Sequence, residues 1–99
     1  MMPRLHPLDA LGNPVRREIL RRLKAGPQSV GQLAERFPVS RPAISRHLRL
    51  LQDAGLVEPR REGTRSLYAV RVQGFASVRD YLDDFWDTAL SRLQERARR

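Results

Sequence analysis

The residues best suited to chemistry in this sequence are arginines in one short stretch and in the turn that follows it. The stretch SRPAISRHLRLLQDAGLV, residues 40–57, is followed almost at once by RREGTR, residues 60–65. A guanidinium group is planar and presents its N–H donors as a fork, which matches phosphate oxygens and the edge of guanine. The pattern therefore predicts two neighbouring surfaces that bind a polyanion.

The charge of the whole chain supports this prediction. Lysine and arginine number 19 against 11 acidic residues, and the formal net charge is +8. All but one of the basic residues are arginine. A generic basic surface is the alternative explanation of the charge alone.

Length and residue types limit the fold and the chemistry. The 99 residues, of which 40% are hydrophobic, predict one domain, residues 1–99, with one small core. The absence of cysteine excludes disulfides, thiolate metal sites and a cysteine nucleophile. No apolar run approaches the ~20 residues of a membrane span, and the first residues lack the apolar region of a signal peptide. We therefore expect a cytoplasmic protein with no membrane contact.

The arginines within residues 40–57 lie on a predicted helix that starts at Ser40. This serine is a good N-cap, and a proline in the first turn is tolerated. Ile44, Leu48 and Leu51 form one apolar stripe. At about 100° per residue, the opposite side of this helix carries Pro42, Ser45, Arg46 and Arg49, with Arg41 at its N-terminal edge.

Two further helices are predicted before it. The first extends from an N-cap at Asn13 to a stop at Gly26. The second opens with a capping box at Ser29 and ends near Phe37, because Pro38 disfavours helix in the residue before it. A tight two-residue turn then leads into the arginine-bearing helix.

A basic hairpin is predicted after that helix. A strand starts at Leu56 and Val57, and Pro59 restricts it to an edge or end position. The alternation in SLYAVRV, residues 66–72, predicts its antiparallel partner, with Gly63 in the connecting turn.

The last segment, about residues 76–97, has the pattern of one long amphipathic helix. Its acidic residues come early and its arginines late, as the helix dipole favours. It carries more apolar surface than one core needs, so we expect a second copy of the chain to cover the surplus. The apolar positions are Val78, Leu82, Phe85, Trp86, Ala89, Leu90 and Leu93.

Together these elements predict a mainly α fold with a small β-hairpin, a winged helix-turn-helix. The recognition helix, about residues 40–53, would lie in the major groove of double-stranded DNA, and the wing, about residues 60–66, on the backbone. The predicted core consists of Ile19, Leu23, Leu33, Ile44, Leu48 and Leu51.

At this point the sequence resembles the ArsR/SmtB family of bacterial winged-helix repressors over nearly its whole length. The resemblance rests on LAERFPVSRPAISRHLRLLQDAGLV (33–57), on RREGTRSLYAV (60–70) and on a terminal helix that contains FW. It implies a homodimeric repressor or autorepressor on a pseudo-palindromic operator, dimerising through its N- and C-terminal helices. An effector, if one is needed, would be an unidentified small molecule or protein.

The resemblance also implies roles for single residues. It assigns Arg41, Ser45 and Arg46 to bases or nearby phosphates. It assigns Arg49, Arg61 and Arg65 to the DNA backbone. The full predicted DNA-binding set is Ser40, Arg41, Pro42, Ser45, Arg46, Arg49, Arg61, Thr64 and Arg65. The predicted dimer interface consists of Leu8, Leu11, Val78, Leu82, Phe85, Trp86, Ala89, Leu90 and Leu93.

Metal sensing is not carried over from that family. Metal-sensing members usually have cysteines near the recognition region, or aspartate and histidine ligands across the terminal helices. Here cysteine is absent and the terminal helix has no histidine, so we expect no metal and no cofactor. Four aspartates of the terminal helix should form a solvated face or pair with arginines of a partner subunit, with a hard-cation site as the alternative: Asp80, Asp83, Asp84 and Asp87.

Three other positions allow more than one interpretation. We expect His6 in a frayed N-terminus, with half a metal site shared with Asp9 as the alternative. His47 should be packed or hydrogen-bonded within the fold, with a phosphate contact as the alternative. Trp86 beside Phe85 should pack in the core or an interface rather than line a ligand pocket.

The alternative function is a winged helix used only for contact with another protein. That use favours exposed apolar residues on the recognition helix, where this sequence has arginine. An enzyme is not expected, because the chain has neither a glycine-rich phosphate loop nor a clustered set of acids and bases. RNA binding would favour exposed stacking aromatics, which are also missing from this region.

Overall fold

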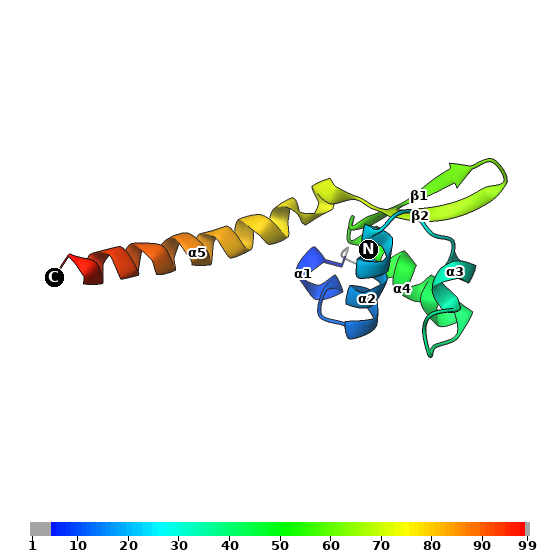
Figure 1. Cartoon of the computed structure of the whole chain (residues 1–99), viewed down its shortest axis with the longest axis horizontal. Helices are drawn as coiled ribbons and strands as arrows, with labels where there is room; N and C mark the ends of the chain where they lie inside the picture. The colour runs from blue at the N-terminus through cyan, green and yellow to red at the C-terminus, as the bar shows by residue number, and fades with distance from the viewer. Residues whose placement is uncertain (1–4, 99) are drawn as a thin grey trace.

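The computed structural model describes residues 5–98 and shows an elongated molecule of 63 × 34 × 27 Å (Figure 1). A body of short helices and a β-hairpin lies at one end, and one long helix extends from it. This mainly helical fold with a two-stranded hairpin confirms the predicted fold class. In chain order the elements are α1 Pro7–Ala10, α2 Pro14–Lys24, α3 Val30–Ala34, α4 Arg41–Asp53, β1 Val57–Glu62, β2 Arg65–Val70, the 3-10 helix η1 Val72–Phe75 and α5 Ala76–Ala97.

Side-chain caps start the first two helices. The Nδ1 atom of His6 accepts a hydrogen bond from the N–H of Leu8 at 3.1 Å, and Pro7 begins α1. The prediction of a frayed N-terminus at His6 is therefore wrong, because the imidazole satisfies an amide that the first helical turn leaves free. Asn13 caps α2, as predicted.

The connection between α3 and α4 is longer than predicted. The capping box at Ser29 is present, and its hydroxyl accepts from the N–H of Gln32 at 3.1 Å. However, α3 ends at Ala34 rather than near Phe37. The N–H of Phe37 donates to the carbonyl of Ala34 at 3.4 Å, so the chain tightens into shorter-range bonds before Pro38.

The core lies between α2, α3, α4 and the base of the hairpin. All six predicted core residues are buried, and five of them have no exposed surface. Full burial of a leucine or isoleucine contributes roughly 1.5–3 kcal/mol. The core also includes residues that the sequence did not predict, Ala10, Leu20, Ala54, Leu56, Val57, Leu67 and Ala69.

The hairpin is more regular than predicted. The strands pair antiparallel up to Glu62 and Arg65, so most of RREGTR is strand rather than loop. Gly63, with φ of 61°, and Thr64 form a two-residue turn. β2 ends at Val70, two residues before its predicted end, because the chain then turns into η1.

The hairpin is fixed to the loop before α3. Gln28 and Tyr68 form an antiparallel bridge, in which each N–H donates to the carbonyl of the other at 3.0 and 2.8 Å. This bridge holds the wing in a set position relative to the two helices of the helix-turn-helix.

The segment that leads into α5, Arg71 and η1, packs closely against the two residues that follow the C-cap of α4, Gly55 and Leu56. The N–H of Arg71 donates to the carbonyl of Leu56 at 2.9 Å, and its guanidinium donates to the carbonyl of Gly55 at 3.3 Å. A Cβ on Gly74 would overlap that same Gly55 carbonyl. Only glycine therefore fits at position 74, and no flexible linker separates the two helices.

Beyond its first turns, α5 leaves the body (Figure 1). Val78 is half-buried, and every described residue from 79 to 98 is exposed. The observed bounds, Ala76–Ala97, are the predicted ones. Across residues 5–98, no helix combines the length and apolar character needed to cross a membrane.

Candidate nucleic-acid interface

Helix α4 has one buried side and one exposed side. Its apolar stripe is fully buried in the core. The hydroxyl of Ser40 accepts from the N–H of Ala43 at 3.3 Å and so fixes the first turn. The opposite side carries the residues predicted to bind DNA. Ser45 is half-buried, and the exposed ones are Arg41, Pro42, Arg46 and Arg49.

Arg41 lies over α3. Its Cζ is 3.6 Å from the position that a Cβ would take on Gly31, and its two terminal nitrogens are 3.6 and 3.7 Å from that position. The guanidinium therefore lies beside α3, at ordinary van der Waals distance from the place that a Cβ at position 31 would take. This place suits a phosphate contact at the helix-turn-helix junction better than a contact with a base edge.

The exposed arginines of α4 and the hairpin tip have no ionic partner among residues 5–98. The ion pairs in this part of the chain are Arg21–Glu18 at 2.8 Å, Arg22–Glu18 at 3.4 Å, Arg60–Glu58 at 3.8 Å and Arg79–Asp83 at 3.9 Å. None of them involves a predicted DNA-binding arginine. The donors of these guanidinium groups are therefore free to bind an external anion.

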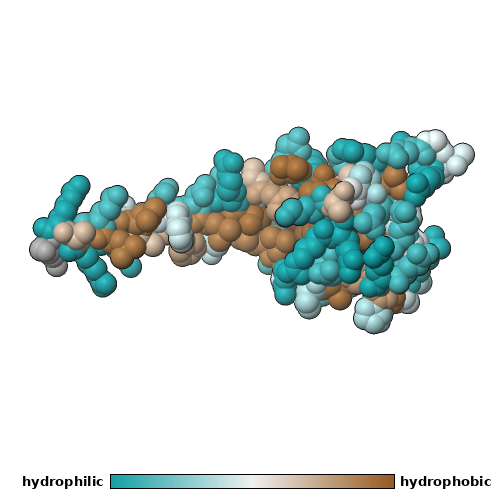
Figure 2. Space-filling view, in the orientation of Figure 1, coloured by the Kyte–Doolittle hydropathy of each residue, from teal (hydrophilic) through white to brown (hydrophobic). Residues whose placement is uncertain are grey.

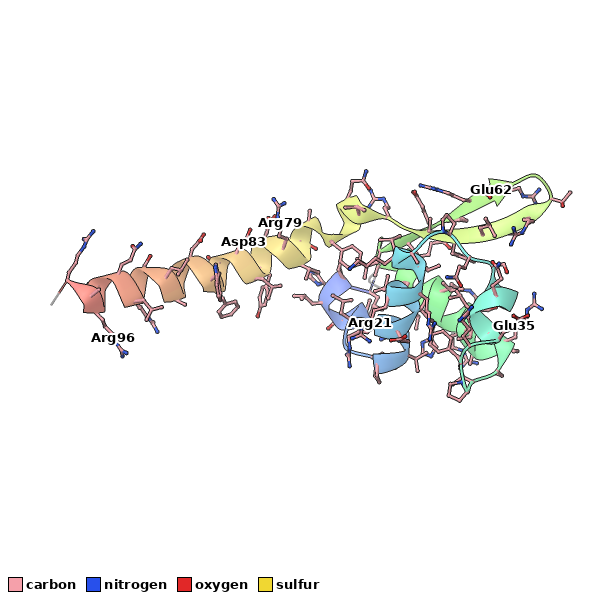
Figure 3. All side chains as sticks on the ribbon, in the orientation of Figure 1. Arg21, Glu35, Glu62, Arg79, Asp83 and Arg96 are labelled. Atoms are coloured by element: carbon pink, nitrogen blue, oxygen red, sulfur yellow. The ribbon has the colours of Figure 1, made fainter. Side chains whose placement is uncertain are left out.

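Arg61 and Arg65 lie on opposite faces of the hairpin. Residues paired across two strands share a face, and successive residues alternate between faces. Arg61 pairs with Ser66, whereas Arg65 pairs with Glu62. The tip, with Glu62 labelled in Figure 3 and Thr64 in the turn, thus presents one arginine to each side.

His47 lies on the flank of α4 and is half-buried. Its Nδ1 atom is buried and has no hydrogen-bond partner within residues 5–98, so the predicted packing is observed without the hydrogen bond. Burial lowers the pKa of His47 below its ordinary value, and the guanidinium groups of Arg16 and Arg46 lower it further. The imidazole is therefore neutral at neutral pH.

We expect the free energy of unfolding to decrease as the pH falls below about 6.5, the pKa of histidine in an unfolded chain. There His47 takes up a proton in the unfolded chain but not yet in the folded one, so acid favours unfolding. The contribution of neutral His47 to the free energy of unfolding is complete above about pH 6.5. It is lost as the pH falls toward the lower pKa that His47 has in the folded state. Thermal unfolding of the wild type and of His47→Gln across this range measures it. A difference in Tm between the two proteins that does not change with pH would contradict the prediction.

One side of α5 presents a continuous apolar stripe (Figure 2). Trp86 is 67% exposed, Phe85 59% and Leu82 58%, and Phe85 packs edge to face with Tyr81 at 5.1 Å between ring centres. Monomeric proteins rarely expose apolar patches of this extent. The predicted interface residues of α5 therefore form one accessible surface, on which Ala89, Leu90 and Leu93 continue the stripe.

The other two predicted interface residues lie near the start of α5. Leu8 belongs to α1, which contacts α5, and is half-buried. Leu11 follows α1 and packs against the core, so only part of its side chain can face a partner.

The candidate metal ligands are not brought together. Within residues 5–98, no group of three or more His, Cys, Asp and Glu side chains is arranged to hold a metal ion. His6 caps α1, and one aspartate of α5 pairs with Arg79. The four aspartates are all exposed on α5, Asp80, Asp83, Asp84 and Asp87.

Three residues that support this surface were not predicted. Gly31 lies under the guanidinium of Arg41, Gln28 holds the hairpin, and Gly74 allows η1 to pack against Gly55, just after α4. The glycines gave a weak signal, because glycine inside a helical pattern often marks close packing. No sequence signal marked Gln28, because it contributes a backbone bridge to Tyr68, a residue far along the chain.

Comparison with known sequences finds a helix-turn-helix family and transcriptional regulators that are similar to this chain. Residues 11–60, which include the helix-turn-helix and the first four residues of β1, match a family described as "Helix-turn-helix domain". The HTH-type transcriptional regulator Rv2034 of Mycobacterium tuberculosis is 49% identical over 83 residues, which cover 84% of this chain and 78% of that protein.

Two solved structures are similar over most of the chain. A crystal structure described as a possible transcriptional regulator for arsenical resistance is 44% identical, with a TM-score of 0.76, and the match covers 92% of this chain and 95% of the other. The second is a homodimeric winged helix-turn-helix DNA-binding domain from Mycobacterium bovis, a possible ArsR-family transcriptional regulator. It is 33% identical, with a TM-score of 0.62, and the match covers 79% of this chain and 72% of the other.

Proposed function

The chain belongs to the ArsR/SmtB family of winged helix-turn-helix transcriptional regulators, and from that premise we propose a homodimeric repressor that binds double-stranded DNA. Each protomer places α4 in a major groove and its hairpin on the neighbouring backbone. The two α4 helices bind the two halves of a pseudo-palindromic operator. The dimer acts in the cytoplasm, where it occupies its operator and excludes other proteins from it.

The observation that carries this proposal is a row of arginines on the exposed side of a capped helix that have no ionic partner within residues 5–98. The buried stripe fixes the rotation of α4, so Arg46 and Ser45 face outward from its first two turns. N-terminal residues of a recognition helix are those that reach base edges. We assign these two residues to bases, and Arg41 and Arg49 to phosphates.

The alternative, a winged helix that binds only other proteins, is not favoured by the surface of α4. Among residues 5–98, the large exposed apolar side chains are on α5, apart from Val72 at the start of η1. The exposed side of α4 presents charge instead.

A footprint on the DNA upstream of the protein's own gene tests the proposed function. We expect a protected site with two symmetry-related halves, about one helical turn apart. In a gel-shift competition, duplex DNA should displace the labelled operator and duplex RNA should not. Equal competition by RNA, or no protected site at any promoter tested, would refute the proposal.

The wing should contribute to affinity without contributing to sequence preference. Replacing Arg61 or Arg65 by alanine should lower the slope of log affinity against log salt by about 0.9 for each phosphate that the protein no longer neutralises. Because the two arginines lie on opposite faces of the tip, we expect a minor groove with phosphates on both sides, and an additive effect in the double variant. Filter binding across a salt series measures these slopes.

The matched control for the wing is Arg98→Ala, which removes one exposed arginine from the far end of α5. It should leave the salt slope unchanged. If only one of the two wing variants changed the slope, the hairpin would lie flat on one strand instead of entering the groove.

Transition metals should not control operator binding. Soft metals require thiolates, which the sequence lacks, and zinc, nickel and cobalt usually require imidazole ligands. We expect operator affinity to change less than twofold with a chelator or with low micromolar zinc, nickel, cobalt or copper. A change of tenfold or more that is lost on replacing His6 or Asp83 would establish a metal sensor instead.

A further inference from the structure

We propose that the cavity between α2, the hairpin and η1 binds an apolar carboxylate of the medium-chain fatty acid class. The cavity has a volume of about 460 Å³, within the range of small-molecule sites in proteins. Neither the recognition surface nor the apolar stripe of α5 includes it.

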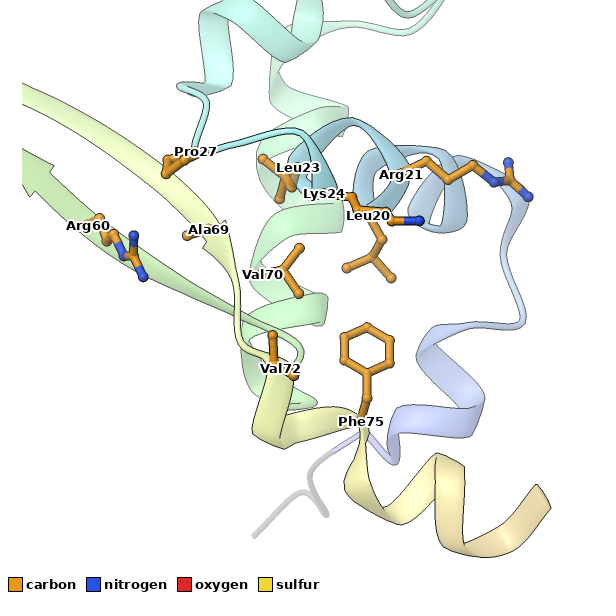
Figure 4. A pocket seen from close by; sticks show the side chains of 10 residues that line it. All are labelled: Leu20, Arg21, Leu23, Lys24, Pro27, Arg60, Ala69, Val70, Val72 and Phe75. Atoms are coloured by element: carbon orange, nitrogen blue, oxygen red, sulfur yellow. The ribbon is translucent and has the colours of Figure 1, made fainter. Parts of the chain in front are cut away.

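The lining of the cavity is apolar on three sides. Leu20 comes from α2, Val70 from the hairpin and Phe75 from η1, and their side chains point toward one another across the cavity (Figure 4). Val72 also lines it and is 74% exposed, although it is a large apolar residue. A ligand with an apolar body would remove these side chains from water.

The charged part of the lining is entirely basic. Arg21, Lys24 and Arg60 line the cavity, and no acidic residue does. Arg21 already pairs with Glu18, and Arg60 with Glu58. Lys24 has no ion pair among residues 5–98, so its ammonium is the group to which we assign the carboxylate of the ligand.

A second copy of the chain is a poorer occupant of this cavity. If the C-terminal part of a partner's α5 reached the cavity, it would bring three arginines, Arg92, Arg96 and Arg98, and one acidic residue, Glu95. Arginines at that end would face the three basic residues of the cavity. The free apolar stripe of α5 lies on the helix that extends away from the cavity (Figure 1).

A ligand bound in this cavity is placed to change DNA binding. This part of the proposal rests on the proposed function. The cavity is lined by α2 of the body, by both strands of the wing and by the 3-10 helix that leads into α5. A ligand that packs against all three parts favours the arrangement of α2, wing and η1 in which it fits best, so operator affinity changes to the extent that this arrangement differs from the DNA-bound one. By linkage, the operator must change ligand affinity by the same factor.

Isothermal titration calorimetry of the full-length dimer with decanoate, below its micelle-forming concentration, tests the proposal. We expect one decanoate per chain, bound at least tenfold more tightly than decanol or decylamine. Lys24→Glu should weaken decanoate binding at least tenfold and decanol binding less than twofold. The control Arg36→Glu reverses an exposed charge outside the cavity and should leave both unchanged.

Two further variants test the apolar part. Val70→Trp should fill the cavity and abolish binding, and its thermal unfolding shows whether the fold persists. Val72→Glu changes a mostly exposed residue, so it should fold normally and still repel decanoate. Binding that survives both variants, or that is equal for decanoate and decanol, would overturn the assignment.

The remaining outcomes separate this proposal from the proposed function. A wild-type dimer that binds operator but not decanoate would refute only the ligand site. The same holds if decanoate bound only to a monomeric Trp86→Ala, Leu90→Ala variant, because a second copy would then cover the cavity. Decanoate binding without operator binding would refute the repressor function and leave the ligand site standing.

Discussion

Replacing Trp86 and Leu90 together by alanine is expected to convert the dimer into folded monomers. Both side chains are exposed on the protomer, so their removal leaves the core unchanged. In a symmetric dimer each substitution occurs twice, and the four truncated side chains contribute roughly 1.5–3 kcal/mol each. The sum, about 6 kcal/mol or more, corresponds to a dissociation constant raised by about 10⁴-fold or more.

Sedimentation velocity at micromolar concentration measures this change, and operator binding reports its consequence. A monomer binds one half-site only, so we expect operator affinity to fall by at least about 100-fold. The matched control replaces Asp84 and Ser91 by alanine. These residues lie on the opposite side of α5, at about 100° per residue, and should leave the dimer intact. A Trp86 and Leu90 variant that stays dimeric would move the interface to another surface.

Replacing Arg46 by alanine should give the second largest effect, a loss of sequence preference at the operator. A base contact of an arginine contributes ~1–3 kcal/mol, so operator affinity should fall by about 5- to 150-fold at matched salt. Affinity for a scrambled duplex should fall much less. The ratio of the two affinities, measured by fluorescence anisotropy, is therefore the informative quantity.

Arg46→Lys separates the role of charge from that of shape. Lysine retains the positive charge but lacks the planar fork that binds guanine with two parallel hydrogen bonds. We expect it to preserve binding to a scrambled duplex and to lose discrimination for the operator. If Arg46→Ala left both affinities unchanged, α4 would not be the helix that contacts the bases.

Helix α4 could be predicted in detail because everything that defines it is local. The cap at Ser40 and the stripe from Ile44 to Leu51 determine where the helix starts and which side is buried. The outward direction of Arg46 follows from the same stripe. The side chain of Arg41 does not, because its place over Gly31 depends on how two helices pack.

The faces of the hairpin could not be predicted from composition. A shift of one residue in pairing reverses every side chain of a strand, so only the observed register separates Arg61 from Arg65. The sequence indicated a turn near Gly63 but not that the turn has two residues.

The exposure of α5 could not be predicted for a different reason. An apolar stripe has the same pattern whether the chain's own core or a partner covers it. The surplus of apolar residues predicted a partner, and the structure adds that nearly the whole length from residue 79 stands free. The contact of Gly74 with Gly55, which sets the direction of this helix, joins residues far apart in sequence.

The contact of Gly74 with Gly55 couples the direction of α5 to the position of the recognition helix, which ends just before Gly55. At 1.5 Å per residue, a helix of 22 residues is about 33 Å long, close to the ~34 Å of one turn of DNA. Because the body of each protomer is fixed rigidly to its own α5, a change of about 10° in the angle at which two such helices cross would displace a body by about 6 Å. In the proposed dimer, a displacement of that size would take α4 out of register with its groove, so the crossing angle of two helices that make no contact with DNA would set the operator spacing that the dimer accepts.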